Sequence, residues 1–593
     1  MVESGSKHTA RTEAPSLIRR AGYLLVLGCS SRKRQVKGRV PALELYDGVN
    51  FRVVRAFLNQ HGWPPGLCIK ILSAKYGLIE ATDQVEHYDQ RLDQATAYNI
   101  NSKVMESFAN FGEAASVFVN LGKDYLPAIK GIEHLFDKKR IVHAVGGIGR
   151  KMAQMKQWLN SLPSKTATLP GVGSGRHYLY FFPDWDDYVT EPFLHETENE
   201  SGLEKTKQYA HEVFGADATP YDGMLVSLAQ LYTGKGALSR LKADTVKKTD
   251  LRKAMKIPER LLLFGDCGAF SYASKDKPPF TPEEAASLYH RFGFDVGASV
   301  DHIPLAEIVI KNDKGELVRQ VLTKSKRRCR MQLTAQNAEA FLATCKRHRY
   351  KFVPVGVIQG LNTESYVHYV HEYLDMGYQH IALGGLVPKP DSEILAICSA
   401  VRQAIQNRTR IEKENVWLHL FGILRPMIQP SFRLLGVSSF DSASYLRKAW
   451  LRSDQNYLAA DGSRWYSSIR VPLSSSKRLK EAAKEKNISE ERLSEMEMRC
   501  LLALNNFDGS HKAHLEVMES VNNYGPLLQR RGEDNHFFEK YNQLLNDRPW
   551  EKCHCEVCRN LGIDIVVFRG AGRNKRRGFH NTWVLYNKIL RGH

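Results

Sequence analysis

The chain is 593 residues long, too long for a single hydrophobic core, and its length predicts three or four domains. A hydrophobic fraction of 43% and a charged fraction of 25% are typical of a globular protein. No apolar run approaches the roughly 20 residues that a membrane span needs, which argues against an integral membrane protein. Lysine and arginine number 84 against 64 for aspartate and glutamate, a net charge of +20. This balance is compatible with a polyanionic partner, although many globular enzymes are equally basic.

The N-terminus and the cysteines indicate the compartment. Residues 1–20 predict a disordered lead-in without the apolar core of a secretory signal, so we expect a cytoplasmic protein with no membrane partner. Of the ten cysteines, seven are scattered and three cluster at Cys553, Cys555 and Cys558. Scattered cysteines in such a chain suggest reduced thiols, whereas a tight cluster suggests a metal site.

Residues 21–165 alternate strand-like and helix-like runs and predict a small α/β domain with an open parallel sheet. The predicted strands end in small and basic residues. Free backbone amides at such ends can bind an anion, helped by the side chains of Arg32, Lys33, Lys75 and Arg150. Nucleotide or phosphate binding is one hypothesis for this domain. Ordinary βα-turns with solvated side chains are the other, because no P-loop or dinucleotide fingerprint is complete. A Pro/Ser/Gly-rich linker is predicted from Leu162 to Gly175.

Residues 171–451 repeat a strand, a polar or glycine-rich strand end and a helix-length span. This rhythm fits a (β/α)8 TIM barrel better than a doubly wound sheet, and it places the active face where the polar strand ends gather. The seven predicted strands run over residues 178–187, 261–264, 298–300, 352–358, 381–383, 416–420 and 434–440.

The stretch from Leu261 to Asp301 shows the pattern most clearly. An apolar strand, 261–264, stops at Gly265 and Asp266. Thr281 is then a predicted helix N-cap, since proline and two glutamates follow it. The next short strand again ends in a carboxylate, Asp301.

The rest of the chain does not continue the repeat of strands and helix-length spans. Residues 452–549 predict a helical insertion or cap, in which 488–505 is the clearest amphipathic helix. Residues 550–593 predict a zinc-binding module that completes the barrel.

Four residues of that module have the spacing of a zinc site. Cys553, Cys555 and Cys558 supply three soft ligands within six residues, and His580 can close a tetrahedral Cys3His site. Four protein ligands leave no open position, so we interpret the metal as structural zinc; unrelated thiols are the alternative. Between these ligands, the run Arg569–Arg577 predicts a basic loop, either one that contacts phosphates or one that is merely solvated.

Six motifs taken together resemble the queuine/archaeosine tRNA-guanine transglycosylase family. They are GDCGAFSY (265–272), GVIQG (356–360), ALGG (382–385), HLFG (419–422), SSFDSASY (438–445) and the Cys-x-Cys-x-x-Cys…His pattern. The resemblance covers roughly residues 171–593 and implies the barrel with its zinc module. The chain is most similar to the branch that modifies DNA, which carries a comparable extra α/β domain before the barrel.

The resemblance implies a pentosyltransferase that exchanges guanine in a polynucleotide for a 7-deazaguanine base without cutting the backbone. A carboxylate attacks the anomeric carbon, guanine leaves, and the incoming base displaces the carboxylate. By motif match, Asp441 is the nucleophile and Asp266 the general acid/base. A helix N-cap is the alternative role for Asp441, and a structural carboxylate at a strand end is the alternative for Asp266.

The same match assigns a pocket for the base. Asp301 would accept hydrogen bonds from the amidine-like edge of guanine or deazaguanine, although an aspartate beside His302 is equally suited to cap a loop. Gln359 would read the same edge. The match completes the pocket with the backbone of Gly384 and Gly385 and with two rings that stack on the flipped base or pack in the core, Phe270 and Phe421.

Because some residues differ from the family pattern, the motifs do not determine which base is incorporated. Cys267, Ala269 and Ser271 differ from the tRNA enzymes, which commonly carry glutamine at the position of Ser271. By resemblance alone we favour 7-cyano-7-deazaguanine (preQ0).

Three hypotheses for function follow. The leading one is a DNA-guanine transglycosylase, for which the resemblance implies partner proteins of a DNA-modification system and a homodimer, since family members often dimerise. The second is the same reaction on tRNA, disfavoured by the lack of an RNA-binding segment between the zinc module and His593. The third is a non-catalytic nucleic-acid-binding barrel, against which the presence of Asp266, Asp301 and Asp441 argues.

Overall fold

The computed structural model describes residues 22–36, 38–109, 111, 114–163, 169, 178–184, 187–191, 206–215, 217–241, 250–311, 316–412, 416–451, 454–527 and 537–590. The expected lead-in, residues 1–20, and most of the expected linker, 162–175, lie outside the described residues. The chain divides into two compact units. Unit 1 comprises Met1–Ala167, Leu395–Val416 and Leu434–Gly436, and unit 2 comprises the rest.

Unit 1 contains a five-stranded sheet in the order β4-β3-β1-β6-β7. Four strands are parallel, as predicted, but the edge strand β4 is antiparallel to β3. Only three residues separate these two strands, which is enough for a hairpin and too few for the crossover that a parallel pair requires. The strands are β1 (Gly22–Gly28), β3 (Leu67–Ser73), β4 (Gly77–Glu80), β6 (Ala114–Asn120) and β7 (Ile141–His143).

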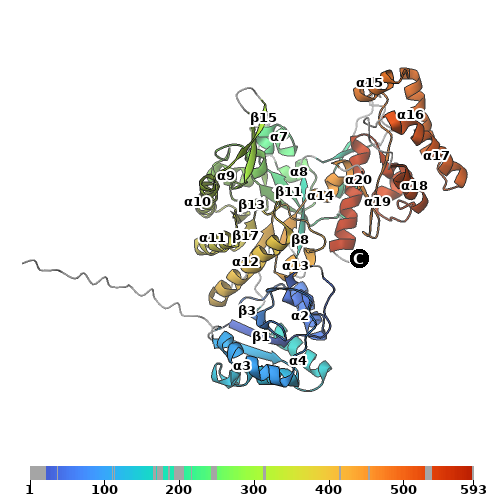
Figure 1. Ribbon diagram of the computed structural model, residues 1–593. Coiled ribbons are helices and arrows are strands. Elements are labelled where there is room, and N and C mark those ends of the chain that lie inside the picture. The colour runs from blue at the N-terminus through green and yellow to red at the C-terminus, as the bar shows by residue number, and fades with distance from the viewer. Residues whose placement is uncertain are drawn as a thin grey trace, which may run out of the picture. The chain divides into compact units, whose positions relative to one another are not determined.

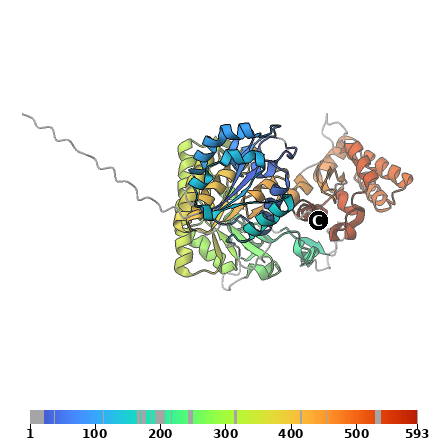
Figure 2. The ribbon, with the colours of Figure 1, turned by 90° about the horizontal axis from the view of Figure 1, so that it is seen from below.

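Helices cover both faces of this sheet (Figures 1 and 2). Helix α2 (Val49–His61) packs against α4 (Ile148–Asn160), and α3 (Gln94–Ala109) packs against β4. The central strand β1 is therefore a continuous apolar run, with Leu24–Leu27 fully buried. Unit 1 also includes the body of helix α12 (Asp391–Glu412), whose Ser399 hydroxyl donates to the Thr82 carbonyl at 2.6 Å.

Unit 2 is built on a closed barrel of eight parallel strands, which confirms the predicted (β/α)8 fold. Seven strands overlap predicted runs, although β13 lies two residues before the predicted 298–300 and shares only Ala298 with it, and the eighth, β11, was not predicted. Its five residues hold only three large apolar side chains, and a short run of this kind gives little periodicity. Around the barrel the strands are β8 (Leu179–Asp184), β11 (Gly223–Ser227), β12 (Leu262–Asp266), β13 (Val296–Ala298), β16 (Val353–Ile358), β17 (His380–Leu383), β18 (Trp417–Leu420) and β19 (Ser439–Asp441).

The prediction of a strand over 434–440 is wrong in its first half. Residues up to Leu434 belong to helix α13 (Gln429–Leu434), and Gly436 then turns the chain at φ 73°. Only a glycine enters this left-handed region at little cost, so the chain leaves the helix there and begins β19 three residues later.

The helices between the strands begin where the sequence indicates. Helix α9 (Pro282–Phe292) starts with a complete capping box, in which the Thr281 hydroxyl accepts from the Glu284 amide and the Glu284 carboxylate accepts from the Thr281 amide. Other connecting helices are α10 (Lys324–His348), α11 (Thr363–Met376) and α14 (Ser444–Leu451), several of which are visible around the strands in Figure 1.

The C-terminal part of unit 2 is helix-rich, as predicted for 452–549. Helix α15 (Lys477–Glu485) packs on α16 (Glu490–Asn505), and α17 (His511–Tyr524) packs on both α16 and α18 (Phe537–Asp547). The last helices are α19 (Glu556–Leu561) and α20 (Ala571–Val584), and α20 packs against α14 of the barrel. None of the helices in the described part of the chain is long and apolar enough to cross a membrane.

The predicted basic loop Arg569–Arg577 is wrong on both of its readings. Most of the run lies in α20, and its arginines are buried. Arg573 forms an ion pair with Asp564 at 3.0 Å, and Arg577 donates to the Ala449 carbonyl at 2.7 Å. These guanidinium groups satisfy backbone and carboxylate acceptors inside the protein and are not available to an external phosphate.

Close packing between α9 and the barrel gives a first test. Tyr289 is fully buried, and a Cβ at Gly265 would lie 2.2 Å from its Cε1 atom. We expect Gly265→Ala to destabilise unit 2 by about 1–3 kcal/mol through overpacking, and to lower its thermal midpoint by at least about 2 °C. Gly525→Ala is the matched control, because a Cβ there meets nothing within 4 Å. Equal midpoints for the two variants, measured by differential scanning calorimetry, would contradict the packing argument.

Candidate active site and metal centre

Three carboxylates gather at the carboxyl ends of the barrel strands. Asp266 is the last residue of β12, Asp441 is the last residue of β19, and Asp301 lies three residues beyond β13. All strands of the barrel are parallel, so these ends share one rim, where barrel enzymes have their active sites. Asp301 is 5% exposed and Asp441 is 8% exposed. The structure thus brings together the three acids that the sequence singled out.

Burial and mutual repulsion change the protonation of this group. Burial raises the pKa of Asp266 to about 8, and the charges of Asp301 and Asp441 add to the effect. Burial also raises the pKa of Asp301 to about 6, opposed by a hydrogen bond from Gln359. Like charges in a water-poor site disfavour full ionisation. Near neutral pH, Asp266 therefore holds a proton that it can donate, which is the property of a general acid.

Asp441 is held by two donors on its Oδ1 atom. The Gly422 amide donates at 2.8 Å and the Nε2 atom of His419 lies at 3.2 Å. Burial lowers the pKa of His419, so its ring is neutral, and the Ser439 hydroxyl 2.7 Å from Nδ1 fits a donor to that nitrogen. A carboxylate that is oriented through one oxygen can react through the other.

His419 and Ser439 lie beside Asp441, and the sequence analysis gave neither of them a role. His419 stands inside the apolar run of β18, and Ser439 begins β19. Both residues stand inside family motifs, HLFG and SSFDSASY, but an imidazole between leucines in a buried strand is more often a core residue than a functional one, so no role was assigned.

Gln359 packs closely against two glycines beside Asp301. The Nε2 atom of Gln359 donates to Asp301 Oδ2 at 2.6 Å, while its buried Oε1 atom has no hydrogen-bond partner within the described residues. A Cβ at Gly384 would lie 2.3 Å from Gln359 Nε2, and one at Gly385 would lie 2.7 Å from Oε1. The glycines therefore leave the room that this amide occupies. The Gly384 carbonyl accepts from Tyr366 at 2.7 Å.

The two predicted stacking rings differ in exposure. Phe421 follows β18 and contacts His419 edge-on, with ring centroids 4.6 Å apart. Phe270 lies in a 3-10 helix, η4 (Ala269–Tyr272), after β12, and it is 60% exposed. The alternative that Phe270 is barrel core is therefore wrong. An exposed ring at the rim is available to stack on a planar ligand.

Four buried side chains form a candidate metal centre. The Sγ atoms of Cys553, Cys555 and Cys558 lie 3.5, 3.4 and 3.2 Å from Nδ1 of His580. All four donor atoms lie within 4.8 Å of one another. Zinc bound tetrahedrally at the usual Zn–S and Zn–N lengths separates sulfur from nitrogen by about 3.6 Å, so the residues fit the ion.

The surroundings of His580 support the same assignment. Its Nε2 atom donates to the Leu458 carbonyl at 2.7 Å, which leaves Nδ1 as the ligand. Tyr457 stacks on the imidazole with centroids 4.3 Å apart. His554 is exposed and outside the cluster. Because the cluster supplies four protein ligands, the centre suits a structural zinc that joins the start of α19 to α20.

Comparison with known proteins agrees with this architecture. A DNA-guanine transglycosylase of Salmonella montevideo is 35% identical over 418 residues, which are 69% of this chain and 96% of the relative. The chain belongs to the DNA-guanine transglycosylase family. This membership confirms the family that the motifs indicated, a family of pentosyltransferases that exchange guanine.

Two further matches qualify the relationship. A tRNA-guanine(15) transglycosylase of Methanococcus aeolicus is 27% identical over 202 residues, 33% of this chain, and the chain spans only 27% of that relative. Residues 24–160, in unit 1, match a family model described as a family of unknown function (DUF6884). The extra domain therefore has a recognised family of its own but no assigned role.

Metal analysis tests the candidate centre. We expect about one zinc per chain in the purified protein. The variant Cys558→Ser should lose that zinc and part of the stability of unit 2, because metal binding is coupled to folding. Cys329→Ser is the control, since Cys329 is exposed and outside the cluster. Elemental analysis and thermal denaturation measure both effects. Equal metal content in the two variants would contradict the assignment.

The raised pKa of Asp266 predicts how stability depends on pH. The folded group titrates near pH 8 and the unfolded group near pH 4, so between these values unfolding releases a proton. The contribution of this carboxyl to stability is therefore lost as the pH rises from about 4 to about 8. We expect Asp266→Asn to raise the thermal midpoint more at pH 8.5 than at pH 5. A pH-independent difference between variant and parent would rule out the raised pKa.

Proposed function

We propose that the protein exchanges guanine in DNA for a 7-deazaguanine base through a covalent intermediate on Asp441. The observation that carries this proposal is the group of three carboxylates at the barrel rim, in which Asp266 is protonated near the oriented Asp441. The relative that the chain covers almost completely is named for DNA and guanine, and this supports DNA as the polynucleotide.

In the first half of the proposed reaction, a carboxylate oxygen of Asp441 attacks C1′ of the target deoxyguanosine. The C1′–O bond forms as the C1′–N9 bond breaks, and the electron pair of that bond leaves with guanine. Asp266 donates its proton to the departing base, so guanine leaves as a neutral molecule. His419 and Gly422 keep Asp441 in the orientation for attack through their contacts to Oδ1.

The second half reverses these steps with a different base. Asp266, now ionised, takes the N9 proton of the incoming 7-deazaguanine. N9 then attacks C1′ and displaces Asp441, which restores both carboxyl groups to their starting states. The zinc supplies structure to the neighbouring helices and takes no part in these proton transfers.

Recognition of the base rests on the hydrogen-bonding edge that guanine and 7-deazaguanine share. In the proposed complex, Asp301 accepts from the amidine-like N–H groups, and the unpartnered Oε1 atom of Gln359 accepts a further N–H. Gly384 and Gly385 leave the space in which the Gln359 amide is held toward the base, and Phe270 and Phe421 stack on the faces of the base. Resemblance favours 7-cyano-7-deazaguanine as the incoming base.

Base exchange with two polynucleotides tests the proposal. Purified protein is incubated with labelled 7-cyano-7-deazaguanine and either duplex DNA or tRNA, and label in the polynucleotide is counted. We expect incorporation into DNA alone. Incorporation into tRNA alone would favour the weaker candidate, which the 27% identical tRNA relative suggests.

Trapping of the intermediate tests the nucleophile. With DNA and no incoming base, the parent should form an adduct that survives denaturing electrophoresis, and Asp441→Ala should form none. Asp266→Asn retains the nucleophile and should still form the adduct, at a rate lowered at least tenfold because general-acid catalysis contributes about 10²–10⁴. An adduct in Asp441→Ala would refute the assignment.

A further inference from the structure

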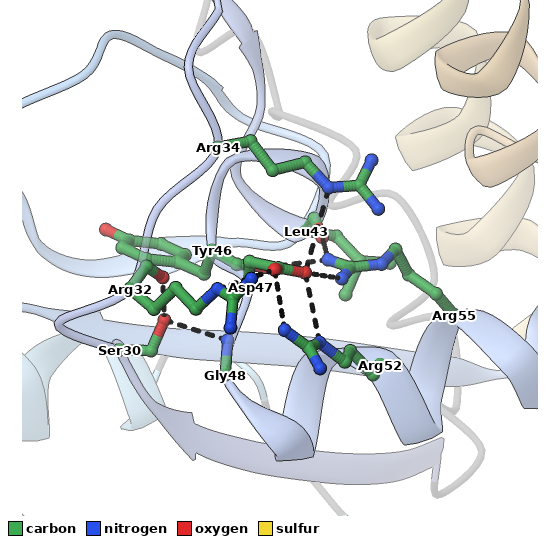
Figure 3. Close-up of polar contacts among 9 residues, drawn as sticks. All are labelled: Ser30, Arg32, Arg34, Leu43, Tyr46, Asp47, Gly48, Arg52 and Arg55. Atoms are coloured by element: carbon green, nitrogen blue, oxygen red, sulfur yellow. Dashed lines mark hydrogen bonds and ion pairs between the residues drawn. The ribbon is translucent and has the colours of Figure 1, made fainter.

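Four arginines surround a single carboxylate in unit 1 (Figure 3). Asp47 precedes helix α2, and it lies against Arg32 and Arg34 from the loop after β1 and against Arg52 and Arg55 from α2 itself. We call Arg32, Arg34, Arg52 and Asp47 the arginine cluster. None of the four takes part in the proposed base exchange.

Nitrogen atoms of four arginines lie around the two carboxylate oxygens of Asp47. Arg52 Nη2 lies 2.9 Å from Oδ2 and Arg55 Nη2 lies 2.7 Å from Oδ1, while Arg32 Nε and Arg34 Nε lie at 3.2 and 3.8 Å. The hydrogen bond from Arg52, with the charges of Arg52, Arg55 and Arg34, lowers the pKa of Asp47 to about 2. Asp47 is therefore a permanent anion that holds the arginines in place.

The four arginines divide into one structural and three exposed groups. Arg55 is buried, and it also donates to the carbonyl groups of Leu43 and Tyr46, so it fixes the chain before α2. The side chains of Arg32, Arg34 and Arg52 are 71%, 42% and 49% exposed. Arg32 and Arg34 approach Asp47 through Nε, so these contacts do not use their terminal amino groups.

Positive charge exceeds negative charge at this place. Asp47 and the buried Glu44 are the two acids that act on Arg55. Against their two negative charges stand four guanidinium groups, which leaves an excess of two positive charges. Lys33 and Lys75, which follow strands β1 and β3, add two further positive charges. Both lie over the ring of Tyr88, at 4.3 and 5.9 Å from its centroid. The first turn of α2 carries no acidic residue that would offset its dipole.

We propose that the arginine cluster binds the phosphodiester backbone of the DNA that the barrel modifies. Guanidinium groups match the geometry of phosphate oxygens, and Asp47 restricts them before the DNA arrives, which lowers the entropy lost on binding. The side chains are spread over an exposed loop and a helix, whereas a site for a small nucleotide buries most of its ligand. Several exposed guanidinium groups side by side can contact successive phosphates of a polyanion. This inference rests on DNA as the substrate in the proposed function.

The proposal restricts the phosphate binding expected of this domain to one group of its basic residues. Arg32, Lys33 and Lys75 of the predicted set lie at the ends of β1 and β3, whereas Arg150 lies in the first turn of α4, beyond β7. Arg34 and Arg52 were not predicted, because only the fold brings α2 to the loop after β1.

Salt-dependent DNA binding tests the cluster in the full-length protein. The affinity of the parent and of the triple variant Arg32→Ala, Arg34→Ala, Arg52→Ala for a labelled DNA duplex is measured by fluorescence anisotropy from about 50 to 200 mM salt. We expect the slope of log K against log salt to fall by about 2 to 3 in the triple variant, since each lost phosphate contact removes about 0.9. An unchanged slope and affinity would overturn the proposal.

A matched control removes the same charge from the same unit. Lys103→Ala, Lys138→Ala and Lys139→Ala replace three exposed lysines on α3 and a 3-10 helix. We expect this variant to bind DNA like the parent. A loss equal to that of the arginine variant would show that only net charge matters, and would overturn the proposal. Saturable binding of dGMP at the cluster, with DNA affinity unchanged in the arginine variant, would overturn it in favour of a free nucleotide.

Asp47→Asn separates positioned arginines from mere charge. This variant is more positive by one, so general electrostatics predicts tighter DNA binding, whereas a positioned cluster predicts equal or weaker binding once Asp47 no longer holds it. Circular dichroism establishes that the variant is folded. Tighter binding by the folded variant would count against the proposal.

Base exchange is measured in the same preparations, so that the two proposals fail separately. If the parent exchanges guanine in DNA but the arginine variant binds DNA unchanged, the inference on unit 1 is wrong and the proposed function stands. If the parent exchanges nothing in DNA but the arginine variant loses affinity, the proposed function is wrong and the cluster stands.

Discussion

The placement of three carboxylates in a water-poor site at one rim is the constraint on which the active face of the barrel depends. Barrel closure brings Asp266, Asp301 and Asp441 to one rim in a water-poor site, where three full negative charges are costly. The site relieves this cost in two ways. Gln359 donates to Asp301, the Gly422 amide donates to Asp441 and the Gly268 amide donates to Asp266, and Asp266 in addition keeps a proton. The protonation of Asp266 is therefore a consequence of burial, to which the charges of Asp301 and Asp441 add.

The same physical reasoning explains why small residues surround the acids. Tyr289 fills the space above Gly265, and Gln359 fills the space beside Gly384 and Gly385. In each case a large side chain from one element occupies the volume that glycine leaves on another, which fixes the strand ends within narrow limits. Arrangements of this kind hold reacting groups on rigid strands, with loops left to vary.

Arginine has opposite roles in the two units, and burial decides which. In α20, burial lowers the pKa of Arg577 to about 9, and both terminal amino groups of its guanidinium donate to carbonyl oxygens or to the Asn574 side chain. In unit 1, Arg32 is 71% exposed and shares one carboxylate with three other arginines. Both segments are basic in the sequence. Only in the second does the structure leave positive charge facing solvent.

Local patterns in the sequence determined much of the fold. Apolar runs that stop at polar residues indicated seven barrel strands, Thr281 marked the start of α9, and the spacing of three cysteines with His580 indicated the cluster that forms the candidate metal centre. These signals depend on residues close to one another along the chain, or on ligand types that few other arrangements share. The ordered motifs indicated the family and, by resemblance, the three acids.

Tertiary structure alone decided the rest, because it depends on residues distant in sequence. The short strand β11 is specified by its two neighbours in the closed barrel rather than by its own periodicity. His419 became a partner of Asp441 only when β18 paired with β19, and the pKa of Asp266 depends on charges 35 and 175 residues away. Whether the basic runs of α20 and the loop after β1 were buried or exposed was likewise invisible in composition. Burial and charge proximity are properties of the folded chain.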